Sequence, residues 1–124
     1  MSKINTKVTD SVDFFKGNKP SDLTAKFGSP LYVYSEEILR QRCRDVKNLV
    51  KYPKFSVNYS AKANSNLAFL EIVHEEGLNV DAMSPGEIFV ELKAGFKPEQ
   101  IFYISNNVTA EEMKFAIDHD VLIS

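Results

Sequence analysis

The feature of this sequence that most limits its fold is a regular alternation of two patterns from residue 55 to the end of the chain. Short apolar segments begin near residues 55, 78, 101 and 121, and apolar residues recur at helical spacing between them. Successive apolar segments start about 23 residues apart, which leaves room for one short helix between two strands. Such an alternation is typical of right-handed βαβ units with a parallel sheet.

The same patterns predict the individual elements. The expected strands are 55–61, 78–82, 101–105 and one from 121, and the expected helices between them begin at 65, 85 and 109. Earlier in the chain we expect a short helix that Ser21 caps and Gly28 ends, a strand at 31–34, and a helix that Ser35 opens. Short units of this kind suit a partial (β/α)8 TIM-type barrel, about its first half, and the spacing also fits a doubly wound sheet.

The predicted organisation has two parts. Residues 1–34 form an N-terminal arm with one apolar patch at Val12, Phe14 and Phe15, and residues 35–124 form an incomplete barrel domain. Four strands are half of a barrel of eight, so the chain is expected to be a truncated catalytic unit. Exposed sheet edges would favour self-association.

Composition narrows the functional classes. The net charge of −2 argues against a broad basic surface for nucleic acid or anionic lipid. The sequence has no long apolar run and no apparent signal peptide, so we expect no membrane partner and a cytoplasmic location. Cys43 is the only cysteine and reads as a core residue, while His74 and His119 lack ligand spacing, so no metal site is expected.

The strand at 55–61 points to one candidate catalytic residue. Its alternate residues are apolar, and the other set is polar and leads to Lys62. In a barrel, the polar set would face inward and place Lys62 at the carboxyl end of the strand, where catalytic residues of such barrels lie. A lysine just after a strand is more often a solvated charge, so position alone does not decide between these readings.

Several motifs in order resolve this ambiguity. Residues 59–64 read YSAKAN, 81–87 read DAMSPGE, 94–96 read AGF, 104–107 read ISNN and 28–34 read GSPLYVY. This set resembles the alanine-racemase-like, fold-type III pyridoxal-phosphate (PLP) enzymes, and the continuation of the lysine motif is similar to their diaminopimelate decarboxylase branch. The sequence departs from the family pattern at Ser60, where alanine is usual, and at Pro85 and Ser105, where glycine is common.

The resemblance implies a cofactor, a reaction and site residues. Lys62 would hold pyridoxal 5'-phosphate as a Schiff base, and the reaction that the resemblance implies is the decarboxylation of meso-diaminopimelate to lysine. Asp81 would lie near the lysine and cofactor, and Glu87 would support it. Each acid also has a structural reading, Asp81 as a strand-end cap and Glu87 as a first-turn acid favoured by the helix dipole. Asn64, Asn106 and Asn107 have turn chemistry as their simplest explanation.

The resemblance also implies what surrounds this segment. The rest of the barrel, the phosphate-binding glycines and a C-terminal β domain come later in such enzymes, and residues 31–34 would pair with that β domain. The full-length enzymes complete their sites as homodimers. Because the phosphate-binding residues and the acid that faces the pyridine nitrogen come later in such enzymes, the isolated chain is expected to have little activity. Open alternatives are an ornithine, arginine or carboxynorspermidine decarboxylase, an amino-acid racemase of the same fold, and a non-catalytic PLP-binding module.

Overall fold

The computed structural model describes residues 14–124 of the 124-residue chain. The chain divides into two compact units, residues 1–36 and 37–124, which are described separately here. Val12, one residue of the predicted apolar patch, lies outside the described residues.

The described part of the first unit contains one helix. Helix α1 (Pro20–Phe27) has Lys19 as its N-cap and Pro20 in its first turn, so the prediction that Ser21 caps it is wrong. Proline is favoured at that position because its missing N–H needs no partner there. Gly28 follows the helix with a φ of 89°, as its place after the last turn predicts. The predicted strand at 31–34 is absent from the structure, where these residues pair with no described strand.

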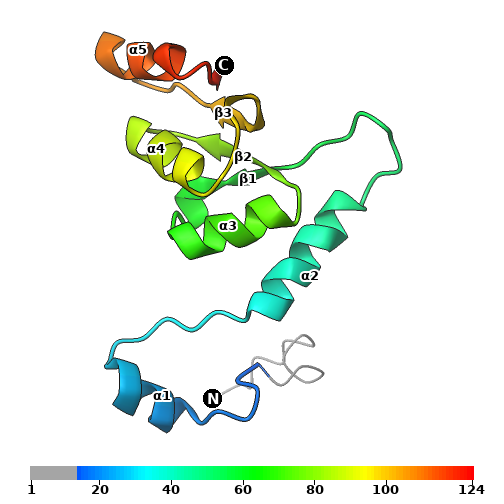
Figure 1. Ribbon diagram of the computed structural model, residues 1–124, viewed down its shortest axis with the longest axis vertical. Coiled ribbons are helices and arrows are strands. Elements are labelled where there is room, and N and C mark those ends of the chain that lie inside the picture. Colours follow the sequence, from blue (N-terminus) through cyan, green and yellow to red (C-terminus); the bar gives the residue numbers. More distant parts are fainter. Residues whose placement is uncertain (1–13) are drawn as a thin grey trace. The chain divides into compact units, whose positions relative to one another are not determined.

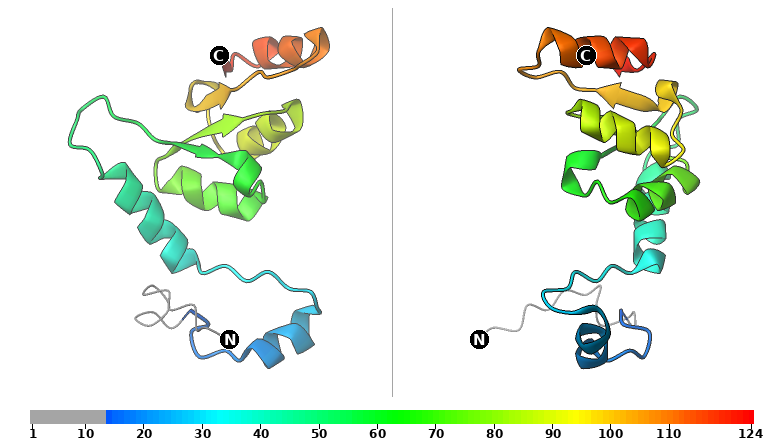
Figure 2. Two further views of the ribbon diagram at one scale, coloured as in Figure 1. Left: turned by 180° about the vertical axis from the view of Figure 1, so that it is seen from behind. Right: turned by 60° about the vertical axis from the view of Figure 1, so that its left-hand side comes forward.

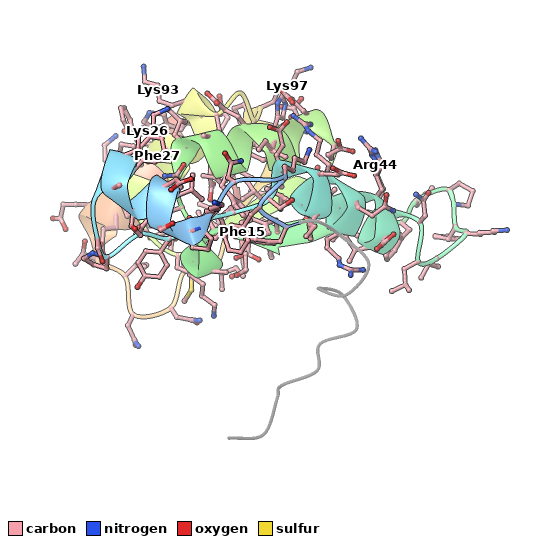
Figure 3. The ribbon with its side chains drawn as sticks, turned by 90° about the horizontal axis from the view of Figure 1, so that it is seen from below. Phe15, Lys26, Phe27, Arg44, Lys93 and Lys97 are labelled. Carbon is pink, nitrogen blue, oxygen red and sulfur yellow. The ribbon has the colours of Figure 1, made fainter. Side chains whose placement is uncertain are left out.

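Helix α2 (Glu36–Lys47) begins directly after Ser35, as predicted, and buries Cys43. Two arginines of α2 bind the end of the next helix: the Arg44 Nε–Glu76 Oε2 distance is 2.7 Å and the Arg40 Nη2–Glu75 Oε2 distance is 2.7 Å. Arg44 is labelled in Figure 3, where side chains are drawn on the ribbon. These ion pairs fix α2 beside the first βαβ unit.

The second unit is built on a four-stranded parallel sheet (Figure 1). Its strands are β1 (Asn58–Ser60), β2 (Asn79–Ala82), β3 (Ile101–Tyr103) and β4 (Leu122–Ile123), adjacent in chain order. Every neighbouring pair is parallel, which confirms the predicted βαβ pattern. The strands are shorter than predicted, and β1 starts at Asn58 because its register with β2 begins there.

Three helices of nine residues connect these strands: α3 (Leu67–Glu75), α4 (Pro85–Lys93) and α5 (Ala110–Asp118). Each is N-capped by a side chain that accepts a backbone N–H bond, and the caps are Asn66, Ser84 and Thr109. Thr109 and the start near residue 85 agree with the predictions, but the cap of α3 is Asn66 and not Ser65. Asn66 caps the helix because its side-chain oxygen accepts a hydrogen bond from the Ala68 N–H.

The core lies between these helices and one face of the sheet. Helix α4 packs against β2, β3 and its two neighbouring helices (Figure 2). The strand residues on this face are completely buried: Val80, Ala82, Ile101 and Tyr103. Residues of the opposite face, such as Asp81 and Phe102, are only partly buried. This is the two-faced arrangement of a barrel wall, with helices outside and an inner face that the described residues leave open.

Candidate functional site

The predicted site begins where β1 and β2 end on the open face of the sheet. Ser60 and Asp81 are register partners on these two strands. Because paired residues in a parallel sheet point to the same face, their side chains can meet, and Ser60 Oγ donates a hydrogen bond of 2.8 Å to Asp81 Oδ1. The structure thus fixes the Asp81 carboxyl group at the carboxyl edge of β2, joined to the strand that leads to Lys62.

Lys62 lies two residues beyond the end of β1 and is exposed. It is in the 3-10 turn η1 (Ala61–Ala63), which packs against β2, so the strand pleat predicted to continue to Lys62 stops at Ser60. Ala61 is fully buried and anchors the turn. The amine is therefore presented from a turn at the carboxyl edge of the sheet rather than from the strand itself.

Hydrogen bonds hold the segment that follows Lys62. The Tyr59 hydroxyl donates to the Asn64 carbonyl at 3.3 Å, and the Asn66 N–H donates to Asn64 Oδ1 at 3.0 Å. The Tyr59 ring also packs on Phe69, with ring centroids 5.5 Å apart. Asn64 thus closes the loop, in agreement with its simpler sequence interpretation. Together these contacts restrain both sides of the turn that carries Lys62.

Glu87 holds the segment between β2 and α4. Its Oε2 accepts a hydrogen bond of 2.6 Å from the Met83 N–H, and its own N–H donates to Ser84 Oγ at 3.2 Å. These contacts belong to the helix N-terminus and correspond to the structural reading of Glu87. They also stabilise the turn that directly follows Asp81, while a part for Glu87 in cofactor binding stays a prediction.

Glu91 is a functional candidate that the sequence analysis missed. It is the one charged residue with no exposed surface in the described part of the chain, and neither carboxyl oxygen has a hydrogen-bond partner. Burial, followed by the nearby charges of Glu87 and Asp81, raises the pKa of Glu91 to about 8. The available signal was its place three residues after Ile88, on the buried stripe of α4.

The other candidates have structural contacts. The His74 and Phe96 ring centroids are 4.9 Å apart, and His119 Nδ1 lies 2.7 Å from the Phe115 carbonyl oxygen. Asn107 is exposed and has a φ of 55°, a conformation that asparagine tolerates better than most residues. None of these contacts links the residue to Lys62 or Asp81.

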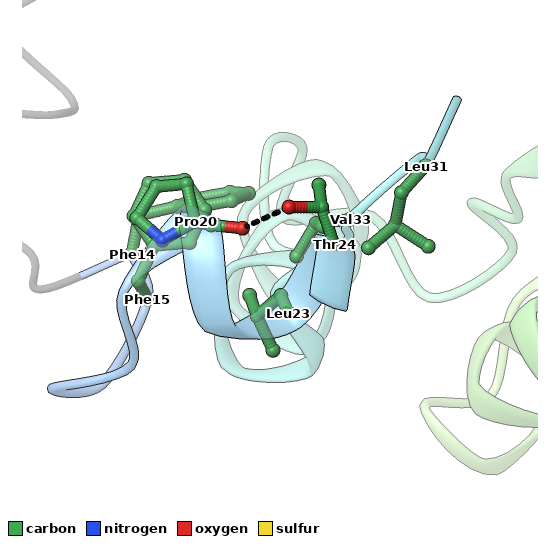
Figure 4. Close-up of a pocket in the computed structure, with 7 residues that line it drawn as sticks. All are labelled: Phe14, Phe15, Pro20, Leu23, Thr24, Leu31 and Val33. Atoms are coloured by element: carbon green, nitrogen blue, oxygen red, sulfur yellow. Dashed lines mark hydrogen bonds between the residues drawn. The ribbon is translucent and has the colours of Figure 1, made fainter. Parts of the chain in front are cut away.

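A separate apolar groove of about 280 Å³ belongs to the N-terminal unit (Figure 4). It lies over α1, whose Thr24 hydroxyl donates to the Pro20 carbonyl at 3.1 Å. The groove is lined by Phe14, Phe15, Pro20, Leu23, Thr24, Leu31 and Val33. It contains none of the predicted site residues.

Residues 36–124 match the family model described as pyridoxal-dependent decarboxylase, pyridoxal binding domain. The chain is 44% identical over 105 residues to the diaminopimelate decarboxylase of Methanothermobacter thermautotrophicus. The aligned segment covers 83% of this chain and 24% of that protein. It is 37% identical over 101 residues to the Bacillus subtilis diaminopimelate decarboxylase, and this alignment covers 80% of this chain and 23% of that protein. The chain thus spans about a quarter of the length of these relatives.

Solved structures show the same relationship. A diaminopimelate decarboxylase from Helicobacter pylori, complexed with L-lysine, superimposes with a TM-score of 0.78 at 30% identity, over 85% of this chain and 27% of that one. A lysine/ornithine decarboxylase from Vibrio vulnificus gives a TM-score of 0.74 at 19% identity, over 82% and 27%, and supports the fold alone.

Among residues 14–124, no helix has the length and apolar character needed to cross a membrane. The parallel sheet with helices on one face agrees with part of a TIM-type barrel, and the predicted fold class is confirmed. The family match over residues 36–124 likewise confirms the resemblance drawn from the lysine motif. The chain belongs to the pyridoxal binding domain family of the pyridoxal-dependent decarboxylases.

Proposed function

We propose that this chain takes part in the PLP-dependent decarboxylation of an amino acid, with meso-diaminopimelate as substrate and lysine as product, and that Lys62 is the cofactor-binding residue. The observation that carries the proposal is the exposed Lys62 in a restrained turn, which packs against β2, the strand whose Asp81 accepts a hydrogen bond from Ser60 of β1. An amine in this place is accessible to an aldehyde, because Lys62 is exposed.

The described residues suit the cofactor in two respects. Lys62 is exposed, so its amine can condense with an aldehyde once it has lost its proton. Asp81 supplies a carboxylate held at the same edge of the sheet, where it can balance positive charge on a lysine nitrogen. When bound, PLP supplies an electron sink for the carbanion that remains after CO₂ leaves.

The choice of substrate rests on the similar sequences. Eight relatives at 30–44% identity are all diaminopimelate decarboxylases, from archaea and bacteria. We therefore favour this reaction over ornithine or arginine decarboxylation, racemisation or cofactor binding without catalysis. The homodimer, the cytoplasmic location, the domain boundary at residue 35, the pairing of residues 31–34 with a β domain and the low activity of the isolated chain stay predictions.

The proposal is tested by cofactor binding and CO₂ release. The 124-residue chain, its Lys62→Ala variant and a Lys54→Ala control are incubated with PLP, and visible absorbance of lysine-bound cofactor is recorded. We expect this absorbance in the parent and the control and its loss in Lys62→Ala. Absorbance that persists in Lys62→Ala would contradict the assignment of Lys62.

Substrate identity needs a second measurement. CO₂ release from meso-diaminopimelate and from ornithine is measured with PLP, with the Methanothermobacter enzyme as the positive control. Any turnover by this chain should favour meso-diaminopimelate and disappear in Lys62→Ala. A preference for ornithine would overturn the proposed substrate and leave the role of Lys62 intact.

A further inference from the structure

The hydrogen bond between Ser60 and Asp81 gives a function to a residue outside the predicted site. The two side chains are partly buried, and the bond of 2.8 Å joins β1 to β2 at the last residue of β1. An alanine at this position would have no atom able to make it. The bond is therefore a property of the serine and not of the strand pairing.

The Ser60 hydroxyl is the donor of this bond, and the Asp81 carboxyl oxygen is the acceptor. An ionised carboxylate only accepts hydrogen bonds, so the Ser60 hydroxyl must donate. Bonds of this kind are stronger than those between neutral groups and hold the carboxylate in one orientation. Strand β2 also packs against the turn η1, so Asp81 lies on the strand that contacts the segment containing Lys62.

Three acids of this region differ in the hydrogen-bond donors that reach their carboxyl groups. Glu87 and Asp81 both act on the buried Glu91, so three carboxyl groups share one region around β2 and α4. Glu87 accepts a bond from the Met83 N–H and Asp81 accepts one from Ser60, whereas Glu91 has no partner for either oxygen. Ser60 is thus the donor that the structure gives to the Asp81 carboxyl group, as the Met83 N–H is for Glu87.

We propose that Ser60 is a positioning residue whose hydroxyl holds the Asp81 carboxylate toward the turn that carries Lys62. This role rests on the proposed function of Lys62 and Asp81. Ser60 itself makes no bond in the reaction. It restricts Asp81 to one side-chain rotamer, so that the negative charge lies at the carboxyl edge of the sheet when the lysine nitrogen becomes positive.

The test compares four variants of the 124-residue chain with the parent. Ser60→Ala removes the donor, Ser60→Thr retains a hydroxyl, and Ser60→Cys replaces it with a weak donor. Asn58→Ala is the matched control, because Asn58 lies two residues earlier on the same strand and pairs with Asn79 instead. Amide spectra and thermal unfolding establish that each variant is folded.

The first readout is the rotamer of Asp81, from its Hα–Hβ coupling constants in the absence of PLP. We expect two unequal couplings in the parent, Ser60→Thr and Asn58→Ala, and averaged couplings in Ser60→Ala and Ser60→Cys. Should Ser60→Ala fail to fold, Ser60→Cys gives the same comparison. Unequal couplings that survive loss of the hydroxyl in a folded variant would overturn the role of Ser60.

The second readout is the rate at which PLP condenses with Lys62. It should fall about tenfold in Ser60→Ala, the change expected for one lost bond to a charged group, and recover in Ser60→Thr. If the Asp81 couplings change as expected but PLP condenses with Lys62 in none of the proteins, including the parent, then the proposed function fails. The conclusion that Ser60 orients Asp81 would still hold. If PLP binds equally fast to all folded variants, the positioning role is refuted while the proposed function stands.

Discussion

Glu91 shows how a single buried residue can make stability depend on pH. Its carboxyl group is fully buried and has no hydrogen-bond donor, so the charged form is disfavoured in the folded protein. Burial is the main cause of its raised pKa of about 8, and the charges of Glu87 and Asp81 add to it. Folded Glu91 therefore keeps its proton over a range in which the unfolded residue, with a pKa near 4.5, has lost it.

This difference sets the sign of a first stability prediction. Between the unfolded pKa of 4.5 and the folded pKa of about 8, the folded state binds the extra proton, so the free energy of unfolding should fall as the pH rises. The largest slope from one such group is about 1.4 kcal/mol per pH unit. Urea unfolding of the parent and Glu91→Met at several pH values should show this slope in the parent and its loss in the variant.

The exposed Glu111 on α5 provides the matched control for this measurement. Glu111→Met should keep the parent's slope, because an exposed carboxyl group loses little solvation on folding. Equal slopes in the parent and Glu91→Met would show that Glu91 ionises in the folded protein as readily as in the unfolded chain.

At the scale of single residues, the sequence was sufficient to predict the family, but it did not predict which side chains contact one another. The motif around Lys62 identified the family correctly, and Ser60 was noted only as a mild departure from it. Its bond to Asp81 depends on the register of β1 with β2, which no local pattern specifies. Glu91 was missed for a similar reason, because its burial comes from the packing of α4 against two strands and two helices.

At the scale of elements, the three helices α3, α4 and α5 end in the same way. After each last turn, a residue with positive φ is followed by a residue whose N–H binds a carbonyl five positions earlier, as in a Schellman motif. In α4, the Gly95 N–H donates to the Leu92 carbonyl at 3.2 Å and the Phe96 N–H to the Glu91 carbonyl at 3.2 Å. The residues with positive φ are Gly77, Gly95 and Asp120.

This geometry gives a prediction for two glycines of one segment. Gly95 has a φ of 100°, and a Cβ there would lie 3.3 Å from two atoms of the His74 ring, so Gly95→Ala should lower the free energy of unfolding by about 1 kcal/mol or more. Gly86, inside α4, has no such φ and only Ser84 Oγ at 3.8 Å. Gly86→Ala should therefore raise the free energy of unfolding by about 0.5 kcal/mol.

Urea unfolding of the two variants and the parent checks this pair of opposite effects. A Gly95→Ala variant as stable as the parent would mean that the turn after α4 does not require the left-handed conformation seen here.

Sequence patterns predicted these elements well where local chemistry decides their ends. Thr109 and Gly28 were correctly placed because a cap and a positive φ depend on few residues. Residues 31–34 form no strand among the described residues, because a strand needs a partner and their expected partner is a later β domain. The strand at 55–61 was too long for the same reason, since only Asn58–Ser60 lie opposite β2.

At the scale of the whole molecule, the two faces of the sheet have different functions. One face packs on the helices and contains the core, whereas the other carries Ser60, Asp81 and Phe102 in register across three strands. Parallel strands place their carboxyl ends at one edge, so the turn after β1 that carries Lys62 and an acid on β2 lie at the same edge although they are far apart in the sequence. The alternation of strands and helices was sufficient to predict this arrangement.

The central claim is that the amine of Lys62 is the group that binds PLP. Its most direct test is to incubate the 124-residue chain with PLP, reduce it with borohydride, digest it and locate the pyridoxyl group by mass spectrometry. We predict a single dominant modification on Lys62, suppressed when the reduction precedes PLP addition. Equal labelling of Lys62 and other exposed lysines, such as Lys51 and Lys54, would contradict the claim.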